Sequence, residues 1–344
     1  MDWPLINQLN SGDEVKGVFL IANKQLNPFS SADKQGRYYL SLTLKDVTGL
    51  IQARIWDFAE DMDVEVGEIV LVEGTVSEYK GNLQLNIRSL EKINEQEIDI
   101  FRFLPRTQKD MSQLIHKINE AIREIANPHL NKLLTIIFGH NSKIKHKFYL
   151  APAGKNVHHA YIGGLMEHSL EVVDLCKVLA DLNPYEIDRD LLITGALLHD
   201  LGKIEEYNIY NAAFNQTDQG ILKGHIILGL EIIAEVISCL NNFPDKLKLM
   251  LEHLIISHHG KQEWGSPIEP KTIEAITLHY ADLMSCHVNH AVQIMNSHSD
   301  QKSAWSKWDK VLNGSLYLGE YLSRIKEIER TSKSSPNSPA STLI

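Results

Sequence analysis

The first third of the chain alternates apolar and polar residues with the period of β-strands. In RYYLSLTLKD (37–46), Tyr38, Leu40, Leu42 and Leu44 share one face, and Tyr39, Ser41 and Thr43 share the other. After a turn at VTG, the segment LIQARIWD repeats the alternation. Five segments of this kind follow one another, at residues 14–26, 37–46, 50–57, 68–79 and 82–90. The pattern predicts five strands.

Two features of these segments indicate how the strands are arranged. The fourth and fifth are joined across Lys80-Gly81, which is typical of a hairpin turn. A polar stretch, FAEDMDVEVG (58–67), separates the third from the fourth. Five short strands with a break at this place predict a small closed β-barrel of the OB type.

From Asn94 onward the apolar residues recur with the period of helices. DMSQLIHKINEAIREIAN (110–127) is amphipathic and ends before Pro128. Further helices are predicted around residues 165–182, 190–200, 224–241, 245–257, 271–297 and 304–327. The Ser/Pro-rich C-terminus is typical of a disordered segment.

The sequence therefore predicts a multidomain α+β protein. An N-terminal five-stranded OB-type barrel is expected over residues 1–95 and a helical connector over 96–135. An all-α helical domain is expected over residues 136–328, followed by a disordered tail over 329–344.

Charge is distributed unevenly along the chain. The formal net charge of -10 argues against a protein with general affinity for nucleic acid. Residues 96–150 are nevertheless basic, with 9 Lys and Arg against 5 Asp and Glu, and the segment ends with Lys143, Lys145 and Lys147. These lysines form either a solvated surface, which is the usual role of such a cluster, or a strip that contacts phosphates.

Nothing in the sequence predicts a membrane segment. No apolar run reaches the length of a membrane span, and MDWPLINQLNSGDEV lacks the basic start and apolar stretch of a signal peptide. The three cysteines are far apart in apolar surroundings, which suggests buried free thiols in a reducing compartment. We expect a cytoplasmic protein.

The segment LLITGALLHDLGKIEEY (191–207) places an acid inside an apolar helix. Burying the ionised Asp200 costs several kcal/mol unless a partner or a cation compensates its charge. Other polar residues that could bind a cation lie in similar apolar surroundings. These are His168, His199, His225, His258, His259 and Asp282. A lone histidine on an apolar face is usually a core residue, but a helical bundle that gathers all of these would provide a metal site.

The donor types indicate which metal such a site would bind. All are imidazole or carboxylate groups, which favours Mn²⁺, Fe²⁺, Co²⁺ or Mg²⁺ over a closed structural Zn²⁺ site. Ions of this kind lower the pKa of water, and two ions bridged by a carboxylate stabilise displacement at a phosphodiester. The expected chemistry is therefore hydrolysis.

The order of these residues resembles a known ligand set. His168, then His199-Asp200 within HDLGK, then Asp282 is similar to the pattern of the HD superfamily of metal-dependent phosphohydrolases. The resemblance implies that Asp200 bridges two ions and that Lys203 faces the scissile phosphate, which makes these two the catalytic candidates. The first ion would be bound by His168, His199 and Asp282. The second would be bound by His225, His258 and His259, as in the binuclear branch of that superfamily.

A barrel that precedes an HD domain narrows the resemblance to one family. With HHAYIGGLMEHSLEV (158–172) and SHHGKQEWGSP (257–267), the chain is similar to the YhaM family of 3′→5′ exoribonucleases from about Val15 to about Ile325. The similarity implies cleavage of single-stranded RNA, and also of single-stranded DNA, with Mn²⁺ favoured. Two alternatives stay open, namely an HD-type phosphodiesterase or phosphatase acting on small nucleotides and a non-catalytic DNA-binding factor. The oligomeric state is also open.

Candidates for contacting nucleic acid lie in three places. Tyr39, Arg54 and Trp56 fall on the outer face of the second and third strands, where OB barrels stack bases and contact phosphates. The alternative is that Trp56 packs under the following loop and that Tyr39 is an ordinary surface residue. His158 and His159 precede the first ligand helix, where they contact either the substrate or only the loop. Lys143, Lys145 and Lys147 would guide a strand between the two domains.

Overall fold

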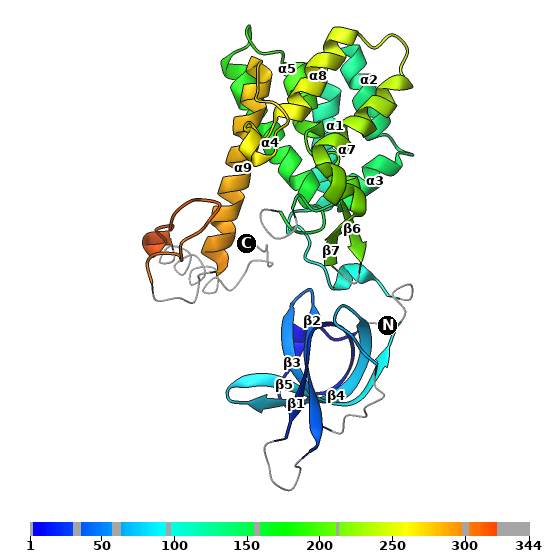
Figure 1. Cartoon of the computed structure of the whole chain (residues 1–344), viewed down its shortest axis with the longest axis vertical. Coiled ribbons are helices and arrows are strands. Elements are labelled where there is room, and N and C mark those ends of the chain that lie inside the picture. Colours follow the sequence, from blue (N-terminus) through cyan, green and yellow to red (C-terminus); the bar gives the residue numbers. More distant parts are fainter. Residues whose placement is uncertain are drawn as a thin grey trace, which may run out of the picture. The chain divides into compact units, whose positions relative to one another are not determined.

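The computed structural model describes residues 3–29, 36–56, 63–93, 98–154, 159–210, 213–297 and 303–321 (Figure 1). The chain divides into two compact units, Met1–Pro105 with Ile209–Asn215, and Arg106–Asn208 with Gln216–Ile344. The predicted boundaries at residues 95 and 135 stay predictions. The tail predicted over residues 329–344 lies outside the described residues.

The first unit contains a closed five-stranded barrel, as predicted. Its strands pair in the order β1-β2-β3-β5-β4, and every pair is antiparallel except β3 with β5. They are β1 (Glu14–Pro28), β2 (Tyr38–Asp46), β3 (Gly49–Ile55), β4 (Ile69–Tyr79) and β5 (Asn82–Lys92). Lys80 and Gly81 between β4 and β5 have φ values of 52° and 81°, which suit a tight hairpin turn.

The apolar side chains of the alternating pattern fill the interior of the barrel. All the residues of β2 and β3 that form its core were expected to face inward: Leu40, Leu42, Leu44, Ile51, Ala53 and Ile55. Tyr39 and Arg54 are half-buried on the outer face, and Trp56 is exposed. The predicted inner and outer faces are therefore confirmed except at Tyr38, the first residue of β2, which was expected on the face of the leucines and is exposed.

The second unit is helical. Its helices are α1 (Met111–Glu124), α2 (Pro128–Ile137), α3 (Lys143–Leu150), α4 (Gly164–Leu182), α5 (Arg189–Leu198), α6 (Lys203–Glu206), α7 (Asp218–Ser238), α8 (Asp245–Ser257) and α9 (Ile273–Ser297). Asn127 caps α2 by accepting hydrogen bonds from the N–H groups of His129 and Leu130, and Pro128 occupies the first helical position. These two residues end α1 and start α2. A two-stranded sheet, β6 (Tyr207–Tyr210) with β7 (Ala213–Gln216), follows α6, and most of it is assigned to the first unit.

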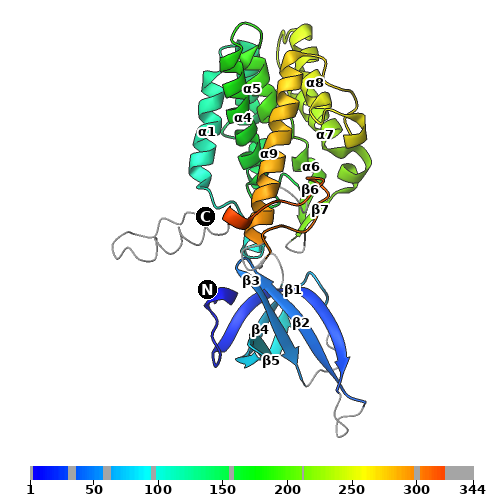
Figure 2. The same ribbon diagram turned by 90° about the vertical axis from the view of Figure 1, so that its left-hand side faces the viewer.

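Helices α4 and α5 form the centre of this unit. Helix α4 packs against α1, α5 and α9 (Figure 2). Helix α5 also packs against α2, α8 and α9. Every residue of α5 from Leu191 to Leu198 is buried. The residues that directly follow, His199 and Asp200, therefore enter the interior of the bundle.

A glycine interrupts α7. Gly224 has φ 72° and ψ 159°, a conformation that is essentially restricted to glycine. No heavy atom would lie within 4 Å of a Cβ at this position, so the requirement for glycine is conformational and not steric. The helix resumes at His225, which determines where that side chain points.

The helix predicted over residues 304–327 is wrong for most of its described part. Trp305 pairs with Tyr317, and Asp309 pairs with Gly314, as in a hairpin. The Asp309 side chain accepts hydrogen bonds from the N–H groups of Val311 and Leu312, which closes a turn in place of a helix. Only residues 319–321 are helical. We call residues 303–321 the C-terminal hairpin.

The cysteines and the helices can be compared with the expectations of buried free thiols and of no membrane segment. All three cysteines are free, but Cys239 is exposed, so the expectation of buried thiols holds for Cys176 and is wrong for Cys239. Among the described residues, no helix combines the length and apolarity that crossing a bilayer requires.

Candidate metal centre

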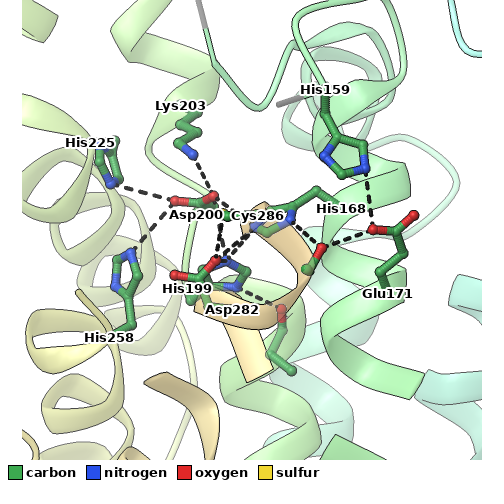
Figure 3. A network of polar contacts seen from close by, with 12 residues as sticks. His159, His168, Glu171, His199, Asp200, Lys203, His225, His258, Asp282 and Cys286 are labelled. Carbon is green, nitrogen blue, oxygen red and sulfur yellow. Dashed lines mark hydrogen bonds and ion pairs between the residues drawn. The ribbon is translucent and has the colours of Figure 1, made fainter. Parts of the chain in front are cut away.

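Side chains from five helices converge inside the helical unit (Figure 3). His168 lies on α4, His225 on α7 and Asp282 on α9. His199 and Asp200 directly follow α5, and His258 and His259 directly follow α8. His168, His199, Asp200 and His258 are each at most 2% exposed. All seven residues predicted as metal ligands are therefore brought together.

Four side chains form a first ligand group. His168 Nε2 lies 3.2 Å from His199 Nε2, 3.5 Å from Asp200 Oδ2 and 3.1 Å from Asp282 Oδ1. His199 Nε2 lies 3.4 Å from Asp200 Oδ2 and 3.8 Å from Asp282 Oδ1. Neighbouring donor atoms bound at about 2.1 Å to one ion lie about 3.0–3.4 Å apart in octahedral or tetrahedral geometry. The group thus has close to the spacing of ligands around one metal ion.

The other carboxylate oxygen of Asp200 belongs to a second ligand group. Asp200 Oδ1 lies 3.4 Å from His225 Nε2 and 3.6 Å from His258 Nε2, and His225 Nε2 lies 3.3 Å from His259 Nε2. Neither Asp200 Oδ1 nor His258 Nε2 has a hydrogen-bond partner within the described part of the chain. Buried polar atoms are rarely left in this condition, and a cation between them would satisfy both. The residues therefore fit two ions that share Asp200.

The ring nitrogens on the far side of these imidazoles are engaged by the protein backbone. His199 Nδ1 lies 2.9 Å from Ala196 O, His258 Nδ1 2.7 Å from Ile255 O, and His259 Nδ1 3.0 Å from Trp264 O. A carbonyl oxygen can only accept, so each Nδ1 carries the proton and each Nε2 presents a lone pair. This is the tautomer that a metal requires from Nε2.

A carboxylate and a hydroxyl lie beside the Nδ1 atoms of the remaining two histidines. Glu206 Oε2 lies 3.0 Å from His225 Nδ1. Ser285 Oγ donates to Glu171 Oε2 at 2.8 Å, so it accepts from His168 Nδ1 at 3.1 Å. Sequence reasoning missed all three supporting residues. Two of them offered a signal, because Glu171 follows His168 by three positions and Ser285 follows Asp282 by three, so each shares a helix face with a predicted ligand.

The electrostatics favour ionised acids and mostly neutral imidazoles. Burial would raise the pKa of the Asp200 carboxyl, but Lys203 and the surrounding histidines hold that pKa well below its usual range. Burial lowers the pKa of His168 and of His258, and together with His258 and His225 it lowers the pKa of His259 to about 3. The pKa of His199 is instead raised, since Asp200 and Asp282 outweigh burial. A metal ion in the first group would take the place of that proton.

Lys203 is the charged partner of Asp200. Its Nζ lies 2.5 Å from Asp200 Oδ2, and the side chain is buried. Burial would lower the pKa of Lys203, but the charge of Asp200 outweighs it and raises that pKa. Lys203 therefore presents a permanent positive charge beside the ligand groups.

A cavity of about 530 Å³ opens onto the second group. Its walls include Asp200, Lys203, His258, His259 and Asp282. Trp264, Tyr207, His287 and Val311 line other parts of it. A volume of this size is typical of a site for a small molecule or for one end of a chain molecule.

The predicted nucleic-acid contacts in the barrel form an aromatic cluster. The Tyr39 and Trp56 rings are 4.9 Å apart between centroids, Phe29 lies 5.1 Å from Tyr39, and the Arg54 guanidinium lies 5.9 Å from the Tyr39 centroid. Trp56 Nε1 donates to Asn86 Oδ1 on β5 at 3.0 Å. The loop under which Trp56 was alternatively expected to pack lies outside the described residues.

Two of the predicted lysine contacts are engaged within the protein. Lys143, Lys145 and Lys147 are on α3, where Lys147 pairs with Glu205 at 2.6 Å and Lys145 lies over the Tyr149 ring. His158 lies outside the described residues.

His159 belongs to the residues that support the candidate metal centre. It is fully buried, and its Nε2 lies 3.3 Å from Glu171 Oε2 and 3.2 Å from Asn289 Nδ2. A buried ring in this position belongs with the groups that hold His168 and not with a surface that contacts RNA.

Comparison with known proteins covers both units. Residues 165–285 match the model of the HD domain family, and residues 20–93 match that of the OB-fold nucleic acid binding domain. The chain is 35% identical over 281 residues to the 3′-5′ exoribonuclease YhaM of Bacillus subtilis, which covers 81% of this chain and 86% of that protein.

Solved structures also resemble the barrel. The second OB-fold domain of replication protein A from Methanococcus maripaludis is 26% identical and covers 28% of this chain and 97% of its own, with a TM-score of 0.24. The OB domain of the protein MM0293 from Methanosarcina mazei is 24% identical and covers 28% of this chain and 88% of its own, with a TM-score of 0.22.

Proposed function

Because the chain belongs to the YhaM family of 3′-5′ exoribonucleases, we propose that it is a metal-dependent hydrolase that removes nucleotides from the 3′ end of single-stranded RNA. The observation that carries the proposal is the pair of ligand groups that share Asp200 and line a cavity. We propose single-stranded DNA as a further substrate and the cytoplasm as the location.

The residues of the two groups would hold two ions, with Mn²⁺ as the proposed metal and Fe²⁺, Co²⁺ or Mg²⁺ as alternatives. Such ions supply a nucleophile from water at neutral pH and neutralise charge on the phosphodiester. His168, His199 and Asp282 would hold one ion, His225, His258 and His259 the other, and Asp200 would set the distance between them. Lys203 would orient a non-bridging phosphate oxygen and offset its charge.

The size of the cavity supports attack at a chain end. A volume of about 530 Å³ suits roughly one nucleotide and not a duplex. A double-stranded substrate would first have to unpair at about 1.4 kcal/mol per step. The choice of the 3′ end over the 5′ end comes from the family.

The barrel would bind the strand upstream of the cleaved bond. Tyr39 and Trp56, with Phe29 beside them, present aromatic rings for stacking, and Arg54 adds a positive charge. The basic residues of α3, Lys143, Lys145 and Lys147, remain our proposed phosphate contacts, with His158 as a further candidate. The acidic balance of the chain limits such contacts to local patches.

One assay tests the proposed function. RNA labelled at its 5′ end is incubated with the purified protein and Mn²⁺, and the products are sized on a gel. We expect a ladder that shortens from the 3′ end and stalls at stable hairpins. Cleavage of circular single-stranded RNA at the rate of the linear form would contradict an exonuclease, and turnover of mononucleotides alone would indicate a small-nucleotide phosphodiesterase.

A further inference from the structure

The C-terminal hairpin exposes several large aromatic side chains. Trp305 is 54% exposed, Trp308 63%, Tyr317 54% and Tyr321 55%. The Trp305 and Tyr317 rings contact each other edge to face, with centroids 5.1 Å apart. Clustered exposed aromatic rings normally mark a surface that binds something. The ligands and the cavity described above leave these four residues without a role.

The hairpin holds these rings on a defined backbone. Ser306 N donates to Leu316 O at 2.8 Å, and Leu318 N donates to Ala304 O at 2.7 Å. Asp309 closes the turn with its side chain and also anchors the hairpin to α9, because its Oδ2 lies 3.0 Å from His290 Nε2. Figure 1 draws the hairpin in orange beside the C-terminal end of α9. A surface fixed in this way loses little conformational entropy when it binds a partner.

The hairpin also borders the candidate catalytic cavity. Val311, within the turn, lines that cavity together with Asp200 and His258. His287, one helical turn before the anchoring His290, lines it as well. The exposed Trp308 precedes Val311 by three positions. A strand whose end enters the cavity would therefore pass close to this surface.

Two lysines alternate with the tryptophans in WSKWDK (305–310). Lys307 and Lys310 are exposed, and in the described part of the chain neither forms an ion pair. The nearby Asp309 is already engaged by His290 and by backbone N–H groups. Aromatic rings interleaved with free cations are what a single-stranded nucleic acid requires, because bases stack on the rings and phosphates contact the cations. A surface that bound another protein could use the aromatic rings but would not require the lysines. RNA is therefore favoured as the ligand of this surface.

We propose that the C-terminal hairpin is a binding site for single-stranded RNA at the entrance of the cavity. Trp305 and Trp308 would stack the bases that precede the 3′-terminal nucleotide, and Lys307 and Lys310 would contact their phosphates. The site deepens the proposed function and rests on it, since it assigns how the strand next to the cleaved bond is held. It is separate from the aromatic cluster of the barrel.

Binding is measured first without cleavage. The full chain carrying Asp200→Ala is titrated into a 5′-labelled single-stranded RNA, and anisotropy gives the Kd. Adding Trp305→Ala and Trp308→Ala should raise the Kd about tenfold or more, the size expected for loss of one or two base–aromatic stacks. Trp305→Phe with Trp308→Phe should recover most of the affinity, because phenyl rings still stack. Lys307→Ala with Lys310→Ala should make the salt dependence shallower, by a slope of about 0.7 for each lost contact.

A matched control separates this site from general surface effects. Tyr185 is 95% exposed on the same unit and does not line the cavity, so Tyr185→Ala should leave the Kd unchanged. In the chain with Asp200 intact, the double tryptophan variant should raise KM for long RNA more than for a dinucleotide. Light scattering on each variant reports the oligomeric state.

Two results would overturn the proposal. One is an unchanged Kd and salt slope in the tryptophan and lysine variants. The other is a change of oligomeric state in the tryptophan variant with unaltered RNA affinity, which would make the hairpin a protein interface. Failure of the intact chain to cleave any RNA would instead refute the proposed function, and the anisotropy experiment would still report on the hairpin.

Discussion

Replacing Asp200 by alanine tests the metal centre at its most connected residue. The change removes Oδ1, which faces His225 and His258, and Oδ2, which faces His168 and His199. Both ligand groups therefore lose a donor at once. Metal ions contribute several kcal/mol of transition-state stabilisation in hydrolysis, and a loss of about 4 kcal/mol corresponds to about a thousandfold in rate. We expect Asp200→Ala to reduce kcat by at least about a thousandfold.

The same substitution should also change stability, because Lys203 loses its partner. Removing one member of a buried ion pair typically costs about 3–5 kcal/mol, since the other charge stays buried and uncompensated. Relief of the desolvated Asp200 carboxylate opposes this cost, so we expect a loss at the lower end, about 3 kcal/mol. Adding Lys203→Met removes the orphaned charge, and the double variant should regain most of that stability without regaining activity.

The assays are thermal or urea unfolding monitored by circular dichroism, and steady-state cleavage of labelled RNA with Mn²⁺. Asp174→Ala is the matched control, because Asp174 lies on the same helix as His168 but its side chain is 61% exposed and 3.9 Å from Lys117. It should retain activity and stability. A folded Asp200→Ala protein with full activity would show that neither ligand group takes part in the reaction.

The remaining predictions concern the supporting residues, the ions, the barrel and the domain boundaries. Glu206→Gln should weaken metal affinity by about 10- to 100-fold in a metal titration, because a glutamine holds the His225 ring less firmly, and an unchanged affinity would argue against a positioning role. Chelation should abolish cleavage and lower the melting temperature, since ions present at 100 times their Kd stabilise the folded state by about 2.7 kcal/mol; equal melting temperatures with and without EDTA would contradict metal binding. Tyr39→Ala should weaken binding of long single-stranded RNA by about 1–3 kcal/mol in anisotropy, whereas unchanged binding would place the strand elsewhere. Residues 136–344 alone should fail to fold by circular dichroism, because α1 and α2 supply part of the helical core, whereas residues 106–344 should fold; a cooperative transition in the shorter piece would contradict this.

The barrel was predictable because β2 and β3 each bury one face and leave the other more exposed. Leu40, Leu42 and Leu44 alternate with polar residues over the length of β2, and a shift of one residue would bury the wrong set. The ligand residues were predictable for a different reason. An acid and a histidine within an apolar run, as at His199 and Asp200, need compensation that only distant parts of the chain can give.

The supporting role of Glu206 was not predictable, because it depends on tertiary geometry. Glu206 reaches His225 only because the chain reverses after α6 and Gly224 redirects the start of the helix that carries His225. In the C-terminal hairpin, the helical periodicity of the sequence was misleading. Trp305, Trp308 and Leu312 recur at helical spacing, but the Asp309 side chain takes the N–H groups that a helix would have used.

The way the barrel closes determines where it opens most easily. Strands β3 and β5 pair in parallel over a short register, Gln52 with Gln84, Ala53 with Leu85 and Arg54 with Asn86. Parallel pairing is slightly less stable per residue than antiparallel pairing, and this seam is the shortest in the barrel. The hydrogen bond from Trp56 to Asn86 lies directly beside this seam and links the end of β3 to β5 through side chains. Among the barrel strands, amide hydrogen exchange should therefore be fastest along this seam. A ligand stacked on Trp56 should slow the exchange, because it would suppress local opening of the sheet.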